Sequence, residues 1–362
     1  MKAIAIAGSL LVGGLGAGCS TNEPAGQEPW STRSNSVLAS DLKQPELKVY
    51  QPLAATSSLT AYRDAAVEIL LQASDAEDPL LRANAIEALQ GMPQYLAPVV
   101  RKGLLDANRG VRFVAVMTVG QKRLAELVPL VQPLVNDEAP SVRAAALYAL
   151  ARCGVEVDLS PLADLLFMDS AEVRANTALV LGDLGNPTAI PMLKVAAKRP
   201  LTRADAARKK IVDLQIAEAL VRLGRDEEIE VIQAALFAPG DQGEIVALAC
   251  QIAGRLIDRQ ALPTLLGLAL RDGARRQSAE IRMAAALAIA RIDPAQSPMN
   301  VPRGYVASPL PGLRAQAALT LGMTGRPEVL EDLGPLLSDP EPLVQVSAAG
   351  AILRVQADSP PN

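Results

Sequence analysis

A block of thirteen residues repeats along most of this chain and limits what it can fold into. The block LRANAIEALQGMP begins at Leu81 and returns as VRFVAVMTVGQKR, VRAAALYALARCG and VRANTALVLGDLG, beginning at Val111, Val142 and Val173. Nine copies can be placed, and their second residues are Arg82, Arg112, Arg143, Arg174, Asp213, Val246, Arg282, Arg314 and Gln345. A steady period of this length is typical of an array in which each unit contacts only its neighbours.

Each unit predicts two helices. Positions one, five and nine of the block are apolar or small, as at Val142, Ala146 and Leu150. A spacing of four places these residues on one face of a helix. Between the blocks lies a second apolar segment, such as ELVPLVQPLVND from Glu126, in which proline stands near the start. Proline is tolerated there because the first turn's amide donors have no partner within the helix.

Two helices per unit, with VRxxAAxAL in the second, resemble HEAT repeats, and more narrowly the short bacterial HEAT-like repeats of phycobilisome lyase subunits. The resemblance covers residues 59–357 and implies an all-α fold, a right-handed α-solenoid of about nine HEAT-like helix pairs. Half of the residues are hydrophobic but only 2% are aromatic, so we expect a core of Ala, Leu and Val. Helix axes about 8–10 Å apart then predict a rod on the order of 80 Å long.

The resemblance also implies a role for the recurring arginine. In HEAT repeats an Asp that ends the first helix and an Arg that opens the second form a hydrogen-bonded ladder between units. The matching residues here are Asp106 and Arg112, Asp137 and Arg143, and Asp169 and Arg174. The alternative is a row of exposed arginines that binds phosphates or carboxylates. The ladder should be interrupted where the block carries Asp213, Val246 or Gln345 instead.

The N-terminus predicts export and lipidation. Residues 1–18 begin with Met1 and Lys2 and continue as an apolar stretch, which is too short to span a membrane and fits a signal peptide. The sequence LGAGC that ends at Cys19 resembles the lipobox of bacterial lipoproteins, in which the cysteine is acylated, although Gly16 stands where Leu is preferred. An ordinary cleaved signal and a cytoplasmic chain with a chance apolar start are the alternatives.

Residues 19–58 are rich in Ser, Pro and small polar residues and are interpreted as a flexible tether. Residues 358–362 form a short C-terminal tail. With a lipidated Cys19, the chain would be anchored to a membrane of the cell envelope on its periplasmic side. Ser20 after the cysteine favours the outer membrane over the inner one.

Composition argues against several chemistries. The chain has no histidine, which removes Ser-His-Asp and Cys-His catalysis and most zinc or non-haem iron sites. Deoxyhypusine hydroxylase, another HEAT-like protein, uses paired His-Glu motifs that are missing here. Cys153 and Cys250 lie three blocks apart, which is too far for a disulfide. A net charge of −4 and few aromatic residues argue against nucleic acid as a partner. We therefore expect no enzymatic activity, no cofactor and no metal.

Departures from the repeat are the candidates for partner binding. The first insertion, residues 194–210, supplies Lys198, Arg199, Arg203, Arg208, Lys209 and Lys210. The simpler interpretation is a long helix with a solvated basic face. The alternative is a basic patch that it forms together with Arg271, Arg275 and Arg276. The segment IDPAQSPMNVPRGYVASPLPG from Ile292 has too many prolines for a normal helix. It predicts an extended loop, with Arg303 and Tyr305 near its tip, that either covers a gap between units seven and eight or binds a partner.

These observations predict a membrane-anchored, non-catalytic scaffold that binds a protein partner in the cell envelope. The identity of that partner does not follow from the sequence. One alternative is a lyase-like or other enzyme subunit that binds a small ligand in the concave groove. The other is a membrane or polyanion binder that works through residues 194–210.

Palmitate labelling tests the anchor. The wild-type chain should incorporate palmitate in its own cell and Cys19→Ser should not, because the acyl chains are attached to that sulfur. Cys153→Ser is the matched control and should keep the label. Equal labelling of the wild type and Cys19→Ser, or no labelling of either, would contradict a lipidated Cys19.

Overall fold

A computed structural model describes residues 58–273 and 276–356, so Cys19, the signal peptide, nearly all of the tether and Arg275 lie outside the described residues. The described part contains nine helix pairs, and the predicted α-solenoid is confirmed. The first helices of the pairs are α1 (Leu59–Ala73), α3 (Pro93–Leu104), α5 (Val128–Val131), α7 (Pro161–Leu166), α9 (Ile190–Lys198), α11 (Ile229–Ala235), α13 (Leu262–Leu270), α15 (Asn300–Arg303) and α17 (Leu330–Leu333).

The second helices of the pairs carry the repeated block. They are α2 (Pro79–Ala88), α4 (Arg109–Lys122), α6 (Pro140–Arg152), α8 (Ala171–Leu184), α10 (Ala206–Arg222), α12 (Gly243–Leu256), α14 (Ala279–Ile292), α16 (Pro311–Met323) and α18 (Pro342–Ile352). Local signals explain their ends: α8 begins where the Ser170 hydroxyl accepts a hydrogen bond from the amide of Val173, and it ends at Gly185, whose φ is 71°.

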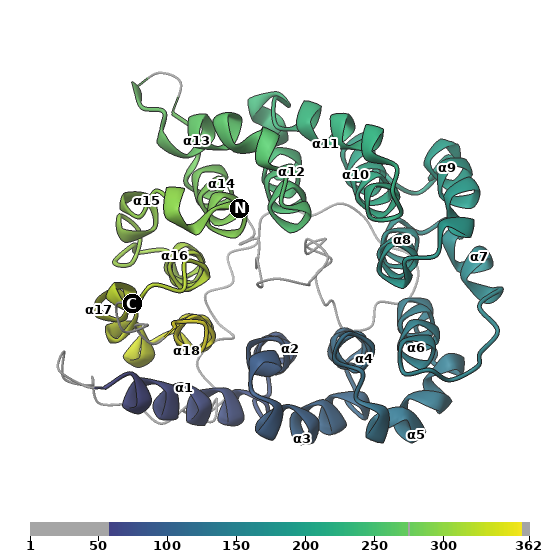
Figure 1. Ribbon diagram of the computed structural model, residues 1–362, viewed down its shortest axis with the longest axis horizontal. Helices are drawn as coiled ribbons and strands as arrows, with labels where there is room; N and C mark the ends of the chain where they lie inside the picture. Colours follow the sequence, from purple (N-terminus) through teal and green to yellow (C-terminus); the bar gives the residue numbers. More distant parts are fainter. Residues whose placement is uncertain (1–57, 274–275, 357–362) are drawn as a thin grey trace, which may run out of the picture.

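The solenoid closes on itself. Figure 1 shows the second helices as an inner layer and the first helices as an outer layer around a ring. At the seam, α18 packs against both α1 and α2. The Arg63 guanidinium on α1 donates a hydrogen bond to the carbonyl oxygen of Val355 at 2.6 Å. A Cβ on Gly350 of α18 would lie only 3.0 Å from Cβ of Ala88 on α2. The expected rod is therefore wrong: the first and last units meet.

Close approach within the inner layer explains the closure. Position ten of the block is Gly120, Gly182, Gly254 or Gly322 in every second inner helix. A Cβ on Gly182 or Gly254 would lie 3.0 Å from Cα of an alanine on the next inner helix, Ala219 or Ala288. Only a hydrogen fits at such contacts, so the inner helices can pack close together around the ring. Nine inner steps of roughly 9 Å close a circle roughly 26 Å across.

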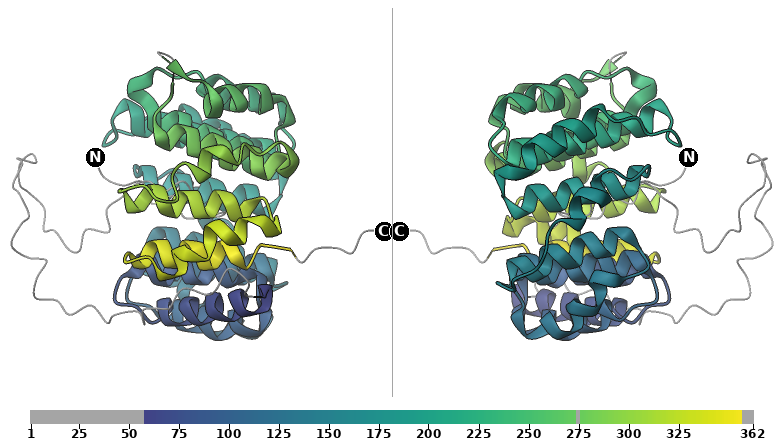
Figure 2. Two further views of the ribbon diagram at one scale, coloured as in Figure 1. Left: turned by 90° about the vertical axis from the view of Figure 1, so that its left-hand side faces the viewer. Right: turned by 90° about the vertical axis from the view of Figure 1, so that its right-hand side faces the viewer.

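Figure 2 shows the inner helices running along the ring axis between two edges, whereas outer helices such as α1 and α3 are seen lengthwise in Figure 1. Within each pair, the connection from the outer to the inner helix lies on one edge, which we call the ladder edge because the recurring arginines lie there. The inner helices begin at this edge and end at the opposite one. Consequently, residues at the same position of the block form a belt around the ring at one height. No helix in the described part of the chain is long and apolar enough to cross a membrane.

Candidate functional site

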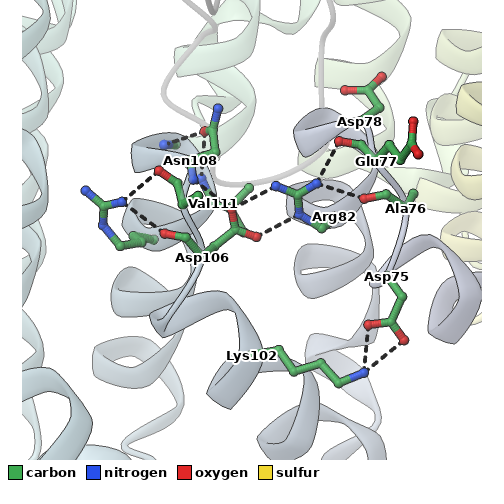
Figure 3. A network of polar contacts seen from close by, with 12 residues as sticks. Asp75, Ala76, Glu77, Asp78, Arg82, Lys102, Asp106, Asn108 and Val111 are labelled. Carbon is green, nitrogen blue, oxygen red and sulfur yellow. Dashed lines mark hydrogen bonds and ion pairs between the residues drawn. The ribbon is translucent and has the colours of Figure 1, made fainter. Parts of the chain in front are cut away.

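The recurring arginines join consecutive pairs (Figure 3). Arg82 donates two hydrogen bonds to the Asp106 carboxylate, at 2.7 and 2.8 Å, and a third to the carbonyl oxygen of Ala76 at 2.8 Å. Arg112 repeats this arrangement with Asp137, at 2.8 and 2.9 Å, and with the carbonyl oxygen of Asp106 at 2.9 Å. Each arginine thus holds the start of its own inner helix and the aspartate of the next pair. The guanidinium groups of Arg82 and Arg112 therefore bind acceptors within the array.

The Arg82 side chain also changes the acidity of Asp106. Burial alone would raise the pKa of this carboxyl, but the hydrogen bonds from Arg82 and from the amide of Asn108 outweigh burial and lower it. Arg82 and Asp106 are both largely shielded from water. The pair is therefore charged throughout the physiological range, as a structural contact requires.

The ladder stops in the fourth pair. Arg143 donates to the carbonyl oxygen of Asp137 at 2.8 Å, without an ion pair to Asp169 among the described residues. Asp169 instead accepts a hydrogen bond from the amide of Thr202 at 2.9 Å. Arg174 is buried, and it donates to the carbonyl oxygen of Arg199 at 2.7 Å rather than to Asp169. The longer connection after α9 brings Thr202 and Arg199 here, which the spacing of Asp169 and Arg174 did not reveal.

The ladder resumes in the last two pairs. Arg314 binds the Asp339 carboxylate through two hydrogen bonds of 2.7 Å. Gln345, where we expected an interruption, donates to the carbonyl oxygen of Asp339 at 2.7 Å. It makes the backbone contact of the missing arginine without the ion pair.

The proline-rich segment packs against the ring. It contains a short 3-10 helix, Pro294–Gln296, and the four-residue α15, so it is less extended than expected. The Tyr305 hydroxyl accepts a hydrogen bond from Arg282 at 3.3 Å, and Arg303 forms an ion pair with Asp332 at 2.9 Å. Val301 packs with side chains of α14 and α16. These contacts favour the first alternative, in which the segment covers the gap between units seven and eight.

The basic insertion is partly neutralised within the chain. The Arg199 guanidinium lies 5.3 Å from the centre of the Phe167 ring, a cation–π contact. Lys209 pairs with Asp213 at 2.8 Å and Lys210 donates to Gln242 at 3.3 Å. Lys198 and Arg203 are exposed, and Arg208 is half-buried on the first turn of α10.

The two insertions do not combine into one basic patch. The segment after α9 is separated from the loop after α13, which carries Arg271 and Arg276, by the pair α11 and α12 (Figure 1). This arrangement leaves the long helix with a solvated basic face as the better of the two interpretations.

The ladder edge also exposes large apolar side chains. Leu105 is 70% exposed, Phe237 74% and Leu310 57%. Met168 and Leu270 are also exposed at this edge. All five lie where an outer helix passes to its inner helix. Phe237, Leu270 and Leu310 come from three consecutive pairs and define what we call the apolar arc. Exposed apolar side chains that gather on one surface usually mark a contact with another molecule.

An open cavity lies beside Phe237 at this edge. Its volume is about 400 Å³, and its lining combines Phe237, Val246 and Leu268 with the polar side chains of Thr264 and Arg271. The repeat pattern did not predict this site. The sequence feature that marks this site is an apolar residue just after the last buried turn of an outer helix. Phe237 in the sequence AALFAPG is that residue.

A second group of residues faces the inside of the ring. Positions seven and eleven of the block lie on the same side of the inner helix, away from positions one, five and nine, because 3.6 residues make a turn. At these positions the chain places the inner charged cluster: Glu87, Arg152, Asp183, Glu218, Arg222, Arg255, Arg291 and Arg354. Arginine recurs five times at position eleven, and this recurrence is the sequence signal for the cluster.

Glu218 is the centre of a network of ion pairs within this cluster. Its carboxylate accepts hydrogen bonds from Arg255 at 2.8 and 2.6 Å and from Arg222 at 2.9 Å. Arg222 also pairs with Asp183 at 2.8 Å. Burial would raise the pKa of Glu218, but the charges and hydrogen bonds of Arg255 and Arg222 outweigh it and lower the pKa. Three consecutive inner helices, α8, α10 and α12, are joined in this way.

The two described cysteines are free. Cys250 is fully buried, and this burial raises the pKa of its thiol to about 12. No group of three metal-ligating side chains occurs within residues 58–273 and 276–356.

Comparison with known proteins agrees with this architecture. A family model described as HEAT repeats matches residues 97–171, from α3 to the start of α8. Residues 97–171 therefore match HEAT repeats, and the other helix pairs of the described residues continue the same arrangement. A search of the curated proteins returns no match.

Two solved structures are similar in a general way. Human deoxyhypusine hydroxylase in complex with glycerol is 17% identical and covers 74% of this chain and 98% of its own, with a TM-score of 0.35. An engineered protein is 16% identical and covers 84% of this chain and 97% of its own, with a TM-score of 0.33. Scores this low carry no argument about the function of this chain.

Removal of the Glu218 charge should destabilise the ring. Glu218→Gln leaves Arg222 and Arg255 without their shared buried carboxylate, which should cost about 3 kcal/mol of unfolding free energy. Glu244→Gln, an exposed site on α12, is the matched control and should change it by less than about 0.5 kcal/mol. Urea unfolding followed by circular dichroism measures both. Equal midpoints for the two variants would show that the Glu218 contacts contribute no net stability.

Proposed function

We propose that this helical scaffold is a lipid-anchored, non-catalytic protein of the cell envelope that binds a protein partner along its ladder edge. The single observation that carries the proposal is the apolar arc of Phe237, Leu270 and Leu310, with its cavity beside Phe237. Phe237 is the most exposed of the large apolar side chains. Burying such a ring against a partner would contribute about 1.5–3 kcal/mol.

The chemistry of this edge fits a protein better than a small ligand. The apolar side chains are spread over three pairs, whereas a small molecule would be surrounded by one concave pocket. Arg271 at the cavity provides a cation beside the apolar surface, and aromatic and arginine side chains are the residues that most often dominate binding energy in protein interfaces. The expected partner therefore presents an apolar side chain to the cavity and an acidic or polar group to Arg271.

The lack of catalysis is supported by how the polar side chains are used. The chain contains no histidine. The acids and bases of the ladder, and Glu218 with its arginines, bind one another. An anchor at Cys19, followed by the tether, would hold the ring near a membrane and let the ladder edge reach a partner there.

Site-specific photo-crosslinking tests the proposal. A photoreactive phenylalanine analogue in place of Phe237, in the anchored chain in its own cell, should give one discrete crosslinked protein. The same analogue in place of Glu230, an exposed residue on the outer helix α11, is the control and should not give it. Leu270→Glu should reduce the crosslink at least several-fold, because it places a charge in the apolar arc. No discrete product, or the same products at both positions, would contradict binding at this edge.

A further inference from the structure

We propose that the cavity beside Phe237 binds the C-terminal residue of the partner protein, which presents a free carboxylate and an apolar last side chain. The inference rests on the proposed function, because it concerns the same cavity at the ladder edge, and it names the part of the partner that enters. Three features of the cavity support it: a gap in the ladder, a cation that binds no acid, and an apolar inner wall.

The cavity lies at a gap in the ladder. Its lining includes Val246, which occupies position two of its block, the position of the ladder arginines Arg82, Arg112 and Arg314. Each of those arginines binds an aspartate 24 or 25 residues further along the chain. The valine side chain is shorter and has no hydrogen-bond donor. The space that an arginine fills in the ladder pairs is therefore open here.

Arg271 stands where the ladder has its acid. It follows Val246 by 25 residues, the spacing of Arg112 and Asp137. It comes directly after α13 with φ −62° and ψ 131°. The ladder aspartates Asp137 and Asp339 come directly after their own outer segments, with φ and ψ of −55° and 147° and of −61° and 142°. The matching spacing and backbone place a cation at a position that carries a carboxylate elsewhere in the ladder.

The guanidinium of Arg271 binds no acid in the described part of the chain. It forms no ion pair or hydrogen bond there, and the neighbouring Asp272 is exposed and does not pair with it. Its Nη2 lies 3.5 Å from the place of a Cβ on Gly267, so the guanidinium rests on α13 at the cavity. The Thr264 hydroxyl and the Gln277 side-chain amide also line the cavity and form no hydrogen bond within the described residues. Three side chains that can donate hydrogen bonds are thus available to a ligand.

The inner wall of the cavity is apolar. Leu236 and Val246 line it and are buried members of the hydrophobic core formed by α10 to α14. Phe237, in the same lining, is largely exposed. An apolar side chain in the cavity would therefore contact this core and remove part of the Phe237 ring from water, which is favourable.

The size and lining of the cavity favour the end of a chain. A cavity of about 400 Å³ is near the lower limit of small-molecule sites, which span roughly 300–1,000 Å³, so it admits one or two residues rather than a helix. In an extended peptide, successive side chains point to opposite faces, so an internal acid and its apolar neighbour do not enter one cavity together. The last residue of a chain carries its carboxylate and its side chain on the same Cα. It therefore offers both groups to one cavity.

The carboxylate of that residue would complete the ladder at this step. The planar guanidinium of Arg271 matches the two oxygens of a carboxylate, as Arg112 matches Asp137 at 2.8 and 2.9 Å. Thr264 and Gln277 can donate to the same oxygens. Capture of a C-terminal carboxylate is a recurring mode of peptide recognition. The partner thus supplies the acid that this step of the ladder lacks.

Peptides with free C-termini test the site. Seven-residue peptides of random sequence are selected on the full chain, purified in detergent, and those that bind should end in Leu, Ile, Val, Met or Phe. The strongest binder is then synthesised as the free acid and as the C-terminal amide, and calorimetry measures both dissociation constants. The amide should bind more weakly by roughly tenfold or more, because it has lost the charge that Arg271 binds.

Two variants and a control connect this preference to the cavity. Arg271→Gln should bind the acid and the amide with nearly equal affinity. Val246→Arg combined with Arg271→Asp rebuilds a ladder pair in the gap, so it should abolish binding and keep or raise the Tm of the chain. Arg276→Gln removes an exposed cation of the same connection that does not line the cavity, and it should bind both peptides as the wild type does.

Equal binding of the acid and the amide by the wild type would overturn the inference. The same holds if no peptide is selected, if the selected peptides share an internal acid but no type of last residue, or if Arg271→Gln keeps the preference for the acid. A discrete crosslink at Phe237 would then leave the proposed function standing. Conversely, a preference for free acids that depends on Arg271, without any crosslinked protein, would support the cavity site and contradict the proposed function.

Discussion

The close contact between neighbouring inner helices is the constraint on which the rest of this structure depends. Glycine at position ten of every second block, as at Gly182 and Gly254, removes the side chain that would otherwise separate two helices. Alanine on the facing helix completes the contact. This close approach keeps the inner layer tight, and nine units turn the chain through a full circle. At the seam, α18 packs against the first pair, so each end of the array covers the other. An open solenoid needs polar capping repeats at its ends instead.

Ring closure divides the polar chemistry of the chain into two belts. At the ladder edge, Arg82 and Arg112 bind the aspartate of the next pair, so this belt supports the stacking. Inside the ring, the ion pairs of Asp183 and Glu218 with Arg222 and Arg255 join α8, α10 and α12. The exposed side chains of the apolar arc lie at the ladder edge, apart from the inner charged cluster.

The sequence predicted the elements better than their arrangement. The block periodicity located all nine inner helices, because burial of positions one, five and nine repeats locally. It did not predict the ring, because the angle between units depends on which helix lacks a Cβ at a contact, as at Gly182. The ladder was predictable at Arg112, where the spacing to the next pair is regular, and not at Arg174, where the longer connection after α9 supplies other acceptors. Phe237 was missed because periodicity describes buried faces, and this side chain lies just beyond one.

A single distance would test the closed ring most directly. Spin labels on cysteines at Asp64 of α1 and Glu331 of α17, both exposed, report the separation of the first and last pairs by double electron–electron resonance, with Cys153 and Cys250 replaced by alanine. Because α1 and the last pair are in contact in the ring, the labels should lie within about 30 Å of each other. An open array of nine steps would place its ends on the order of 80 Å apart. A distribution centred near that longer distance would contradict ring closure.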